Sequence, residues 1–444
     1  MNKNNGLKGF YWVGLLITAL VLYHPITLFG QGNPFKVEVK NGLVTVDVRD
    51  ADVGEVLREI ERGTGVRITV SNDLVGQKIT ARFVDLDPET ALKDILDKAN
   101  SYFVFTLIPD AGAPNKEILR GVKAEGNIFG KRPYKGKITT IYIPYGGGEK
   151  EVGVISGGEG LSIGPSSFNA DDEGNIYICD KVEGRVQVFS PTGAYLYTIP
   201  MKGHPIYRDA TSRGYDTVIQ DVAVDKHGFV YIYDNYGRVF QYDKKGNVIK
   251  SIGVENVKEN WTVAGGPQVI DDEIYIEISM SNNLMDNGLL AIGRILPDKT
   301  LVPPSDEEKK NPRLKNKRFG LITGKEYTGK APSQIRTEIK MKPKDGGLTR
   351  LISFPFEGII SCQFFGEDEK GNFYLKTDRG GENRQLAVEV HKINGDGDYL
   401  TTLKFPRDEF YYDSLKDYSI SKDGTVYDFR ATEKRLQITI FSGE

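Results

Sequence analysis

The sequence predicts an all-β six-bladed propeller preceded by a small α+β domain with the element order βαββαβ. A unit of short alternating strands between Gly, Pro, Asp and Ser turns recurs, and its clearest copy spans residues 165–199. The turn glycines Gly174 and Gly228 are 54 positions apart, and Gly371 and Gly424 are 53 apart. A repeat of about 50 residues with several strands per unit is typical of propeller blades.

The blade count follows from tyrosines that stand in register after each turn. Four copies are clear and a fifth, at Tyr275, is weaker; the clear ones are Tyr177, Tyr231, Tyr374 and Tyr427. Tyr275 and Tyr374 are 99 positions apart, which predicts one more blade, between 310 and 355. The last blade ends at Phe441 without an outer strand, so we expect an early strand within 137–155 to complete it.

The repeat resembles the NHL family of six-bladed propellers. The matching features are the turn glycine, a strand that begins with Asn or Phe, a hydrophobic residue and Tyr, the following Asp, and the run Arg185-Val186-Gln187-Val188-Phe189. The resemblance implies a fold that serves mostly as a binding platform, with some hydrolases and lyases. Because one fold carries several functions, it does not fix the activity of this chain.

Length, charge and cysteine content limit the alternatives. The 444 residues suggest two or three domains, and the net charge of −3 argues against a nucleic-acid partner. Two cysteines cannot form a disulfide framework, and Cys179 and Cys362 fall in blades that are not neighbours. We therefore expect two buried thiols, a monomeric propeller and no bound cofactor.

Residues 1–30 predict export from the cytoplasm. Lys3 and Lys8 precede an apolar run from Phe10 to Tyr23. The run is shorter than the roughly 20 residues of a spanning helix, which favours a cleaved signal peptide, and a retained N-terminal anchor is the alternative. Either one places the rest of the chain outside the cytoplasm.

Residues 36–108 predict a small domain with two helices. Asp52 and Glu55 form a capping box before a helix whose buried face is Val53, Val56, Leu57 and Ile60. Asp87-Pro88 begins a second helix, and 102–108 is a closing strand. Residues 109–136 are rich in Gly and Pro, and we expect a linker that holds this domain loosely beside the propeller at 137–444.

This domain resembles the short N-terminal (STN) domain of secretins and TonB-dependent receptors. The specific parts are the strand-Asp-helix entry at Asp52, the turn Thr64-Gly65-Val66 and the second helix start at 85–92. The resemblance implies a periplasmic or cell-envelope protein of a Gram-negative bacterium, in contact with other envelope proteins and tethered to the inner membrane if the anchor is retained.

Polar residues at the starts of the innermost strands are candidates for a site at the mouth of the central channel. They are Gln220, Asp221, Gln363 and Asp417. Acid and amide side chains there could hold a metal ion, or they could simply be polar channel walls. The turn 394–398 is compatible with calcium binding or with a plain hairpin.

A second candidate surface is basic. The segment 306–350 holds 13 basic and six acidic residues. It could bind an anionic partner or a membrane surface, or it could be a solvated loop. The candidates at its start are Lys309, Lys310, Arg313, Lys315, Lys317 and Arg318.

Asp and Arg recur as a pair in each clear blade, as in Asp180 and Arg185. A feature that every blade repeats is expected to be structural, so we interpret these as ion pairs between neighbouring strands. Gly160-Leu161-Ser162-Ile163-Gly164 fits the pattern of a nucleophile elbow, but no helix is predicted after it, so we expect a loop.

Three functions remain. The first is a non-enzymatic protein-interaction module of the envelope, indicated by two interaction-type folds without a catalytic constellation. The second is a metal-dependent hydrolase or lyase that uses the channel mouth. The third is a ligand or glycan sensor with a stacking platform of Trp261, Tyr411 and Tyr412.

Overall fold

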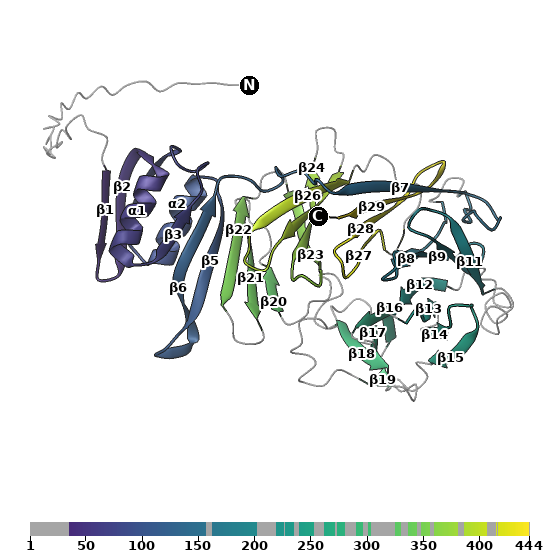
Figure 1. The fold of residues 1–444 in the computed structure, drawn as a ribbon. Helices are drawn as coiled ribbons and strands as arrows, with labels where there is room; N and C mark the ends of the chain where they lie inside the picture. The colour runs from purple at the N-terminus through teal and green to yellow at the C-terminus, as the bar shows by residue number, and fades with distance from the viewer. Residues whose placement is uncertain are drawn as a thin grey trace, which may run out of the picture.

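The computed structural model describes residues 35–156, 162–201, 219–225, 227–234, 239–252, 262–270, 273–279, 290–295, 301–302, 325–329, 336–343, 348–355, 359–380, 386–405, 414 and 416–443. Over these ranges the chain is nearly all β, with two helices (Figure 1). Neither helix is long and apolar enough to cross a membrane. The segment 1–30, expected to direct export, lies outside the described residues.

The N-terminal domain has the two predicted helices. The helix α1 (Val53–Thr64) begins at Asp52, whose side chain accepts a hydrogen bond from the Glu55 amide at 3.1 Å. The helix α2 (Pro88–Lys98) begins at Asp87 in the same way. The domain also contains a three-stranded sheet of β1 (Phe35–Lys40), β2 (Leu43–Asp52) and β4 (Lys78–Leu86). Its strand β3 (Arg67–Val70) belongs to a different sheet. The expected order βαββαβ corresponds to β2 through β5, and β1 and β6 flank it.

The first three blades are four-stranded antiparallel sheets in chain order. Blade one holds β8 (Ser167–Ala170), β9 (Ile176–Asp180), β10 (Arg185–Phe189) and β11 (Tyr195–Pro200). Blade two holds β12 (Ile219–Val224), β13 (Val230–Asp234), β14 (Val239–Tyr242) and β15 (Val248–Ile252). Blade three holds β16 (Thr262–Ile270), β17 (Glu273–Ser279), β18 (Leu290–Ile295) and β19 (Leu301–Val302).

Of the later blades, four and six are extended by strands from the N-terminal part of the chain, whereas blade five is built from consecutive strands. Blade four holds β20 (Lys325–Gly329), β21 (Arg336–Pro343) and β22 (Thr349–Pro355). These strands lie within 310–355, where one more blade was predicted. Blade five holds β23 (Ile359–Glu367), β24 (Phe373–Gly380), β25 (Leu386–Ile393) and β26 (Tyr399–Phe405). Blade six holds β27 (Tyr418–Ile420), β28 (Val426–Ala431) and β29 (Arg435–Ser442). The expected outer strand of blade six is β7 (Lys137–Pro144), which pairs with β29 along its whole length.

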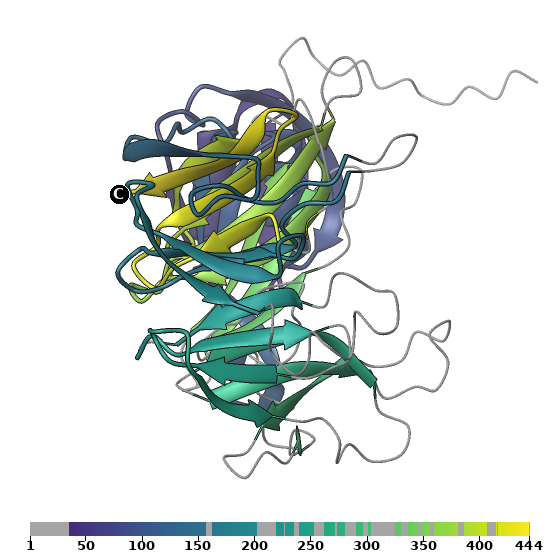
Figure 2. The same ribbon diagram turned by 90° about the vertical axis from the view of Figure 1, so that its right-hand side faces the viewer.

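Neighbouring blades share apolar cores, which makes the assembly a propeller. Phe168 of blade one stacks on Phe429 of blade six, with ring centroids 4.9 Å apart. Further clusters join blades one and two, four and five, and five and six. Figure 2 shows the teal blades one to three continuing from the yellow strands of blade six. The count of six blades, inferred from the tyrosine register, stays a prediction.

The blade turns explain why glycine and tyrosine recur together. Asp225 accepts hydrogen bonds from the backbone amides of residues 227 and 229, at 2.9 Å each, and from the Tyr231 hydroxyl at 3.0 Å. Asp171 and Asp368 make the same three contacts in blades one and five. Gly228 completes the turn at φ 77°, a conformation that favours glycine. The turn carboxylate therefore fixes the tyrosine six residues later.

The strand β5 (Tyr102–Asp110) belongs to two cores at once. It pairs with β22 of blade four on one edge and with β6 (Ala113–Glu125) on the other, in the sheet β20-β21-β22-β5-β6-β3. Side chains alternate along a strand. Phe103 and Phe105 pack in the core of the N-terminal domain, and Tyr102 and Val104 pack in the core between blades four and five. The domain and the propeller therefore share one strand.

The prediction of a loose linker at 109–136 is wrong. Its first half is largely strand β6, hydrogen-bonded to β5 and β3. Its second half follows the outer strand of blade five, where the Thr402 amide donates to the Arg132 carbonyl at 2.7 Å and the Tyr134 amide donates to the Thr402 carbonyl at 3.2 Å. Strand β5, residues 132–134 and strand β7 thus lie at the outer edges of blades four, five and six, and Gly and Pro mark turns within this path rather than a flexible tether.

Side chains strengthen the joint between domain and propeller. Arg336 of β21 is buried, lies 2.9 Å from an Asp97 carboxylate oxygen of α2, and covers the Phe103 ring with its guanidinium 4.5 Å from the centroid. Burial lowers the pKa of Arg336 to about 10, against the opposing effect of Asp97. On blade five, the Tyr102 hydroxyl donates to the Gly397 carbonyl at 2.5 Å.

The same joint contains a fully buried histidine, His391 of β25. Its Nε2 lies 2.8 Å from the Thr377 hydroxyl and 3.7 Å from a Glu389 oxygen, and its ring lies 4.0 Å from that of Phe129. Burial lowers the pKa of His391 well below its usual value, and the positive charges of Arg379 and Lys404 lower it further.

His391 should therefore make stability depend on pH. The unfolded chain binds a proton at His391 below about pH 6.5, whereas the folded chain does not, so the free energy of unfolding falls as pH falls. We expect a loss of about 2 kcal/mol from this group between pH 7 and pH 5. Urea unfolding at both pH values would measure it, with His391→Gln as the control that removes the titration. An equal pH dependence in both proteins would contradict this assignment.

Candidate functional site

One of the predicted inner-strand residues, Asp221, lies where neighbouring blades meet. The strands β8 and β12 are the inner strands of blades one and two. The hydroxyl of Ser167 on β8 donates to the carboxylate of Asp221 on β12 at 2.6 Å, and both side chains are buried. The same carboxylate oxygen accepts the backbone amide of Val222 at 2.9 Å. Asp221 thus ties two blades together beside the central axis.

A local irregularity places Asp221 in this position. The ladder between β12 and β13 pairs Ile219 with Asp234 and Asp221 with Tyr233, so the register shifts at Gln220. Such a bulge turns the following side chain relative to the regular strand. Gln220 itself is half-buried at the bulge.

The other channel candidates occupy the corresponding strands of blades five and six. Asp417 stands just before β27 and accepts a hydrogen bond from the Ser414 hydroxyl, and its carbonyl accepts the Phe429 amide at 2.7 Å. Gln363 lies in β23, opposite Lys376 of β24. Among the residues that the structure describes, no group of three or more His, Cys, Asp or Glu side chains could hold a metal ion.

Several other predicted residues fall outside the described ranges. They include the basic candidates Lys309, Lys310, Arg313, Lys315, Lys317 and Arg318 and the aromatic candidates Trp261, Tyr411 and Tyr412. The turn 394–398 is described: Gly397 has φ 87°, matching the hairpin glycines Gly193 and Gly246, and the Asn394 side chain accepts the amides of residues 396 and 398. Its Asn394 side chain therefore serves the turn itself.

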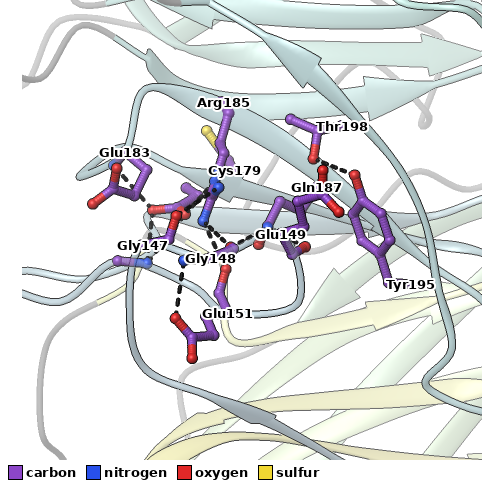
Figure 3. A network of polar contacts seen from close by, with 12 residues as sticks. Gly147, Gly148, Glu149, Glu151, Cys179, Glu183, Arg185, Gln187, Tyr195 and Thr198 are labelled. Carbon is purple, nitrogen blue, oxygen red and sulfur yellow. Dashed lines mark hydrogen bonds and ion pairs between the residues drawn. The ribbon is translucent and has the colours of Figure 1, made fainter.

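The predicted pair of Asp180 and Arg185 is confirmed, and it belongs to a larger network (Figure 3). The two residues face each other across β9 and β10, with Arg185 Nε 3.1 Å from the Asp180 carboxylate. The same guanidinium donates from Nη2 to the carbonyls of Gly148 at 2.9 Å and Glu151 at 2.8 Å. Gln187, two residues along the strand, donates to the Glu149 carbonyl at 2.8 Å.

This network holds the segment 146–153, which joins β7 of blade six to blade one. Asp180 is fully buried and accepts the Gly153 amide with both oxygens, at 3.1 Å each. Burial raises the pKa of Asp180, while the hydrogen bonds from Gly153 and Glu183 and the charge of Arg185 oppose that rise. We name the set of Asp180, Arg185 and Gln187 the loop clamp. Sequence reasoning found the ion pair but missed the loop, because nothing in the spacing of 180 and 185 points to 146–153.

The described polar side chains of these sites contact groups of the chain itself. The carboxylates of Asp180, Asp221 and Asp417 accept hydrogen bonds from groups of the chain itself. Cys179 and Cys362 are free thiols, and burial raises the pKa of Cys179 above the usual range and that of Cys362 to about 12. Because the thiolate is the reactive form, neither cysteine is activated as a nucleophile.

Comparisons with known proteins give fold-level likenesses. No family model matches the chain, and no curated protein matches it. A solved structure of a DUF4221 family member from Bacteroides vulgatus aligns at 11% identity and TM-score 0.41, covering 70% of this chain and 98% of the other.

Two further solved structures align less closely. A virginiamycin B lyase from Staphylococcus aureus shows 12% identity and TM-score 0.35, covering 69% of this chain and 100% of the other. Regucalcin, a calcium-binding protein from Agrobacterium tumefaciens, shows 12% identity and TM-score 0.33, covering 70% and 96%. Likenesses at this level carry no activity to the present chain, and the propeller assignment rests on its own strand order and packing.

Proposed function

We propose that this chain is a non-enzymatic protein-interaction module of the Gram-negative cell envelope. In it, an NHL-like propeller and an STN-like domain act as one binding body. The observation that carries the proposal is the sheet β20-β21-β22-β5-β6-β3, which runs from blade four into the N-terminal domain. A partner that binds the N-terminal domain is therefore held in a fixed position relative to the propeller, and a partner that binds the propeller is held in a fixed position relative to the N-terminal domain.

The contacts of the side chains at the channel and the clamp are consistent with a binding role. Asp221 and Asp417 were the residues most suited to a metal-dependent hydrolase or lyase, and both accept hydrogen bonds within the chain. The export pattern at 1–30 supports a place in the periplasm, either free or tethered to the inner membrane. Other envelope proteins are then the partners that the module would meet.

The test is a cross-linked pull-down from a Gram-negative envelope extract with the full chain. Deleting the N-terminal domain would be misleading, because a cut at residue 108 removes most of β5 and opens blade four. We expect one partner whose cross-links fall on both the N-terminal domain and the propeller. Retention of nothing beyond an untagged control, or cross-links to the N-terminal domain alone, would contradict the proposal.

A further inference from the structure

The outer edge of blade six is open and regular. The strand β7 is the last strand of the sheet β27-β28-β29-β7 (Figure 1). It pairs with β29 from Lys137 to Pro144 without a register shift. The outer strands β11, β15 and β26 each carry a shift beside the hairpin turn that precedes them, whereas no hairpin joins β7 to β29. A regular edge is a template for another extended chain.

Alternate residues of β7 direct their backbone groups away from β29. In an antiparallel pair, opposite residues alternate between those that exchange both backbone hydrogen bonds and those that exchange none. Arg435 and Pro144 are opposite each other and belong to the second kind. The Arg435 carbonyl accepts the Thr432 amide at 3.1 Å, and the Pro144 carbonyl accepts the amide of residue 152 at 3.0 Å. Residues 138, 140 and 142 therefore also face outward, and none of the described strands pairs with them.

The exposed face of this edge is apolar in its middle. Ile138 and Tyr142 are 56% and 49% exposed, and Thr140 between them is half-buried. On the other face, Ile141 and Ile143 are buried in the core shared with blade one, which fixes the face that each residue presents. An added strand would therefore place its own side chains beside Ile138 and Tyr142, where β-branched residues pair well.

Both ends of the edge are basic. Lys137 is exposed at one end, and at the other the exposed Arg435 covers the Tyr142 ring with its guanidinium 3.7 Å from the centroid. Neither Lys137 nor Arg435 forms an ion pair with a described residue. A second copy of the chain is disfavoured, because antiparallel pairing about Thr140 brings the Lys137 end of each strand to the Arg435 end of the other. The charges fit a partner that is acidic at both ends.

We propose that residues 138–142 of β7 bind an extended segment of a partner protein as an antiparallel added strand, with acidic residues on both sides of an apolar centre. This inference rests on the proposed interaction function and names the chemistry of one partner. The backbone of the partner would exchange hydrogen bonds with residues 138, 140 and 142. Its carboxylates would face Lys137 and Arg435.

The probe is the capped nonapeptide Glu-Glu-Val-Thr-Thr-Thr-Val-Glu-Glu, with Lys in place of each Glu as its charge control. Residue-resolved hydrogen exchange of the full chain is measured with and without peptide. We expect the acidic peptide to slow exchange of the amides of residues 138, 140 and 142, and the basic one not to. The amides of residues 139 and 141, which face β29, are the internal reference. Unchanged exchange at the three outward amides, or equal slowing by the basic peptide, would overturn the proposal.

A Thr140→Pro substitution separates backbone pairing from charge attraction. It removes one outward amide, a loss that a strand edge tolerates, and it keeps both basic ends. We expect a nearly unchanged melting temperature and a peptide affinity lower by more than about tenfold. Undiminished affinity in the folded variant would contradict strand addition.

Two peptide isomers N-methylated at alternate residues make the same test in the wild-type chain, should Thr140→Pro fail to fold. Only the isomer with its methyl groups facing β7 should lose the ability to slow exchange. Equal effects of the two isomers would refute backbone pairing.

Charge reversal provides the matched variants. K137E/R435E should weaken binding of the acidic peptide about tenfold at low salt, because two attractions become repulsions. K78E/R82E makes the same charge change on β4 and should leave binding unchanged. An unaffected affinity in K137E/R435E would refute the acidic partner.

The two proposals fail in different ways. Peptide binding at β7 without any envelope partner would sustain the edge and contradict the proposed function. An envelope partner retained by Thr140→Pro, together with no slowing of exchange by the peptide, would contradict the edge and leave the function standing.

Discussion

A Phe105→Ala substitution in the full chain is expected to lower the free energy of unfolding by about 3–5 kcal/mol. Phe105 is fully buried, its ring lies 4.8 Å from that of Phe103, and the truncation leaves a cavity in the N-terminal core. Its backbone pairs with Leu351 of blade four, so the damage should reach the propeller. Urea unfolding followed by circular dichroism would measure the loss.

The matched control for Phe105 lies on another strand from the same part of the chain. Ile138 of β7 is 56% exposed, and Ile138→Ala should change the free energy of unfolding by less than about 0.5 kcal/mol. A Phe105→Ala protein that unfolds in two separate steps, with the larger step unchanged from wild type, would show that β5 does not couple the two parts.

Asp180→Ala should be nearly as damaging, at about 3–5 kcal/mol. The change leaves Arg185 with a mostly buried charge and removes the acceptor of the Gly153 amide. The loop clamp would then lose its hold on 146–153, at the closure between blades six and one. Thermal unfolding monitored by calorimetry gives the measurement.

An exposed ion pair serves as the comparison for Asp180. Lys422 lies 3.6 Å from Asp172, with 66% and 52% of their side chains exposed. Lys422→Ala should cost less than about 1 kcal/mol, since water screens such pairs. Similar losses in Asp180→Ala and Lys422→Ala would mean that the clamp is not the closure that we describe.

The repeating parts of the fold could be predicted because their causes are local. An Asp in the turn, a Gly at positive φ and a Tyr six residues after the Asp are fixed by hydrogen bonds within seven residues, as at Asp225 and Tyr231. The two helices could be predicted for the same reason, because Asp52 and Asp87 cap them from the position just before each helix. These patterns return wherever the chain makes the same turn.

The joint between domain and propeller could not be predicted because its partners are far apart in sequence. Phe103 pairs with Ser353, 250 positions later. One local signal was present: the uninterrupted apolar run Tyr102–Phe105 indicates a strand buried on both faces, as opposed to the edge of a small domain. Pro109 and Pro114 suggested a linker, yet both lie within paired strands near the hairpin turn, where proline is tolerated.

In the candidate site too, local contacts could be predicted from the sequence and contacts between blades could not. Asp221 was predicted to lie at the start of an inner strand, and the structure places it in β12, where it accepts a hydrogen bond from Ser167 of β8. Asp180 and Arg185 were recognised as a pair because they are five residues apart. Arg185 also donates to the Gly148 carbonyl, and Asp180 accepts the Gly153 amide. These hydrogen bonds join blade one to the segment that follows blade six, and no spacing in the sequence indicates them.

The most direct test of the shared strand is native-state hydrogen exchange of the full chain under increasing denaturant. If β5 joins the two parts into one cooperative unit, amides of α1, α2 and β22 should become exposed in a single opening with one free energy and one denaturant dependence. If the amides of α1 and α2 instead exchange through a separate opening of lower free energy while those of β22 stay protected, the domain and the propeller unfold independently and the account is wrong.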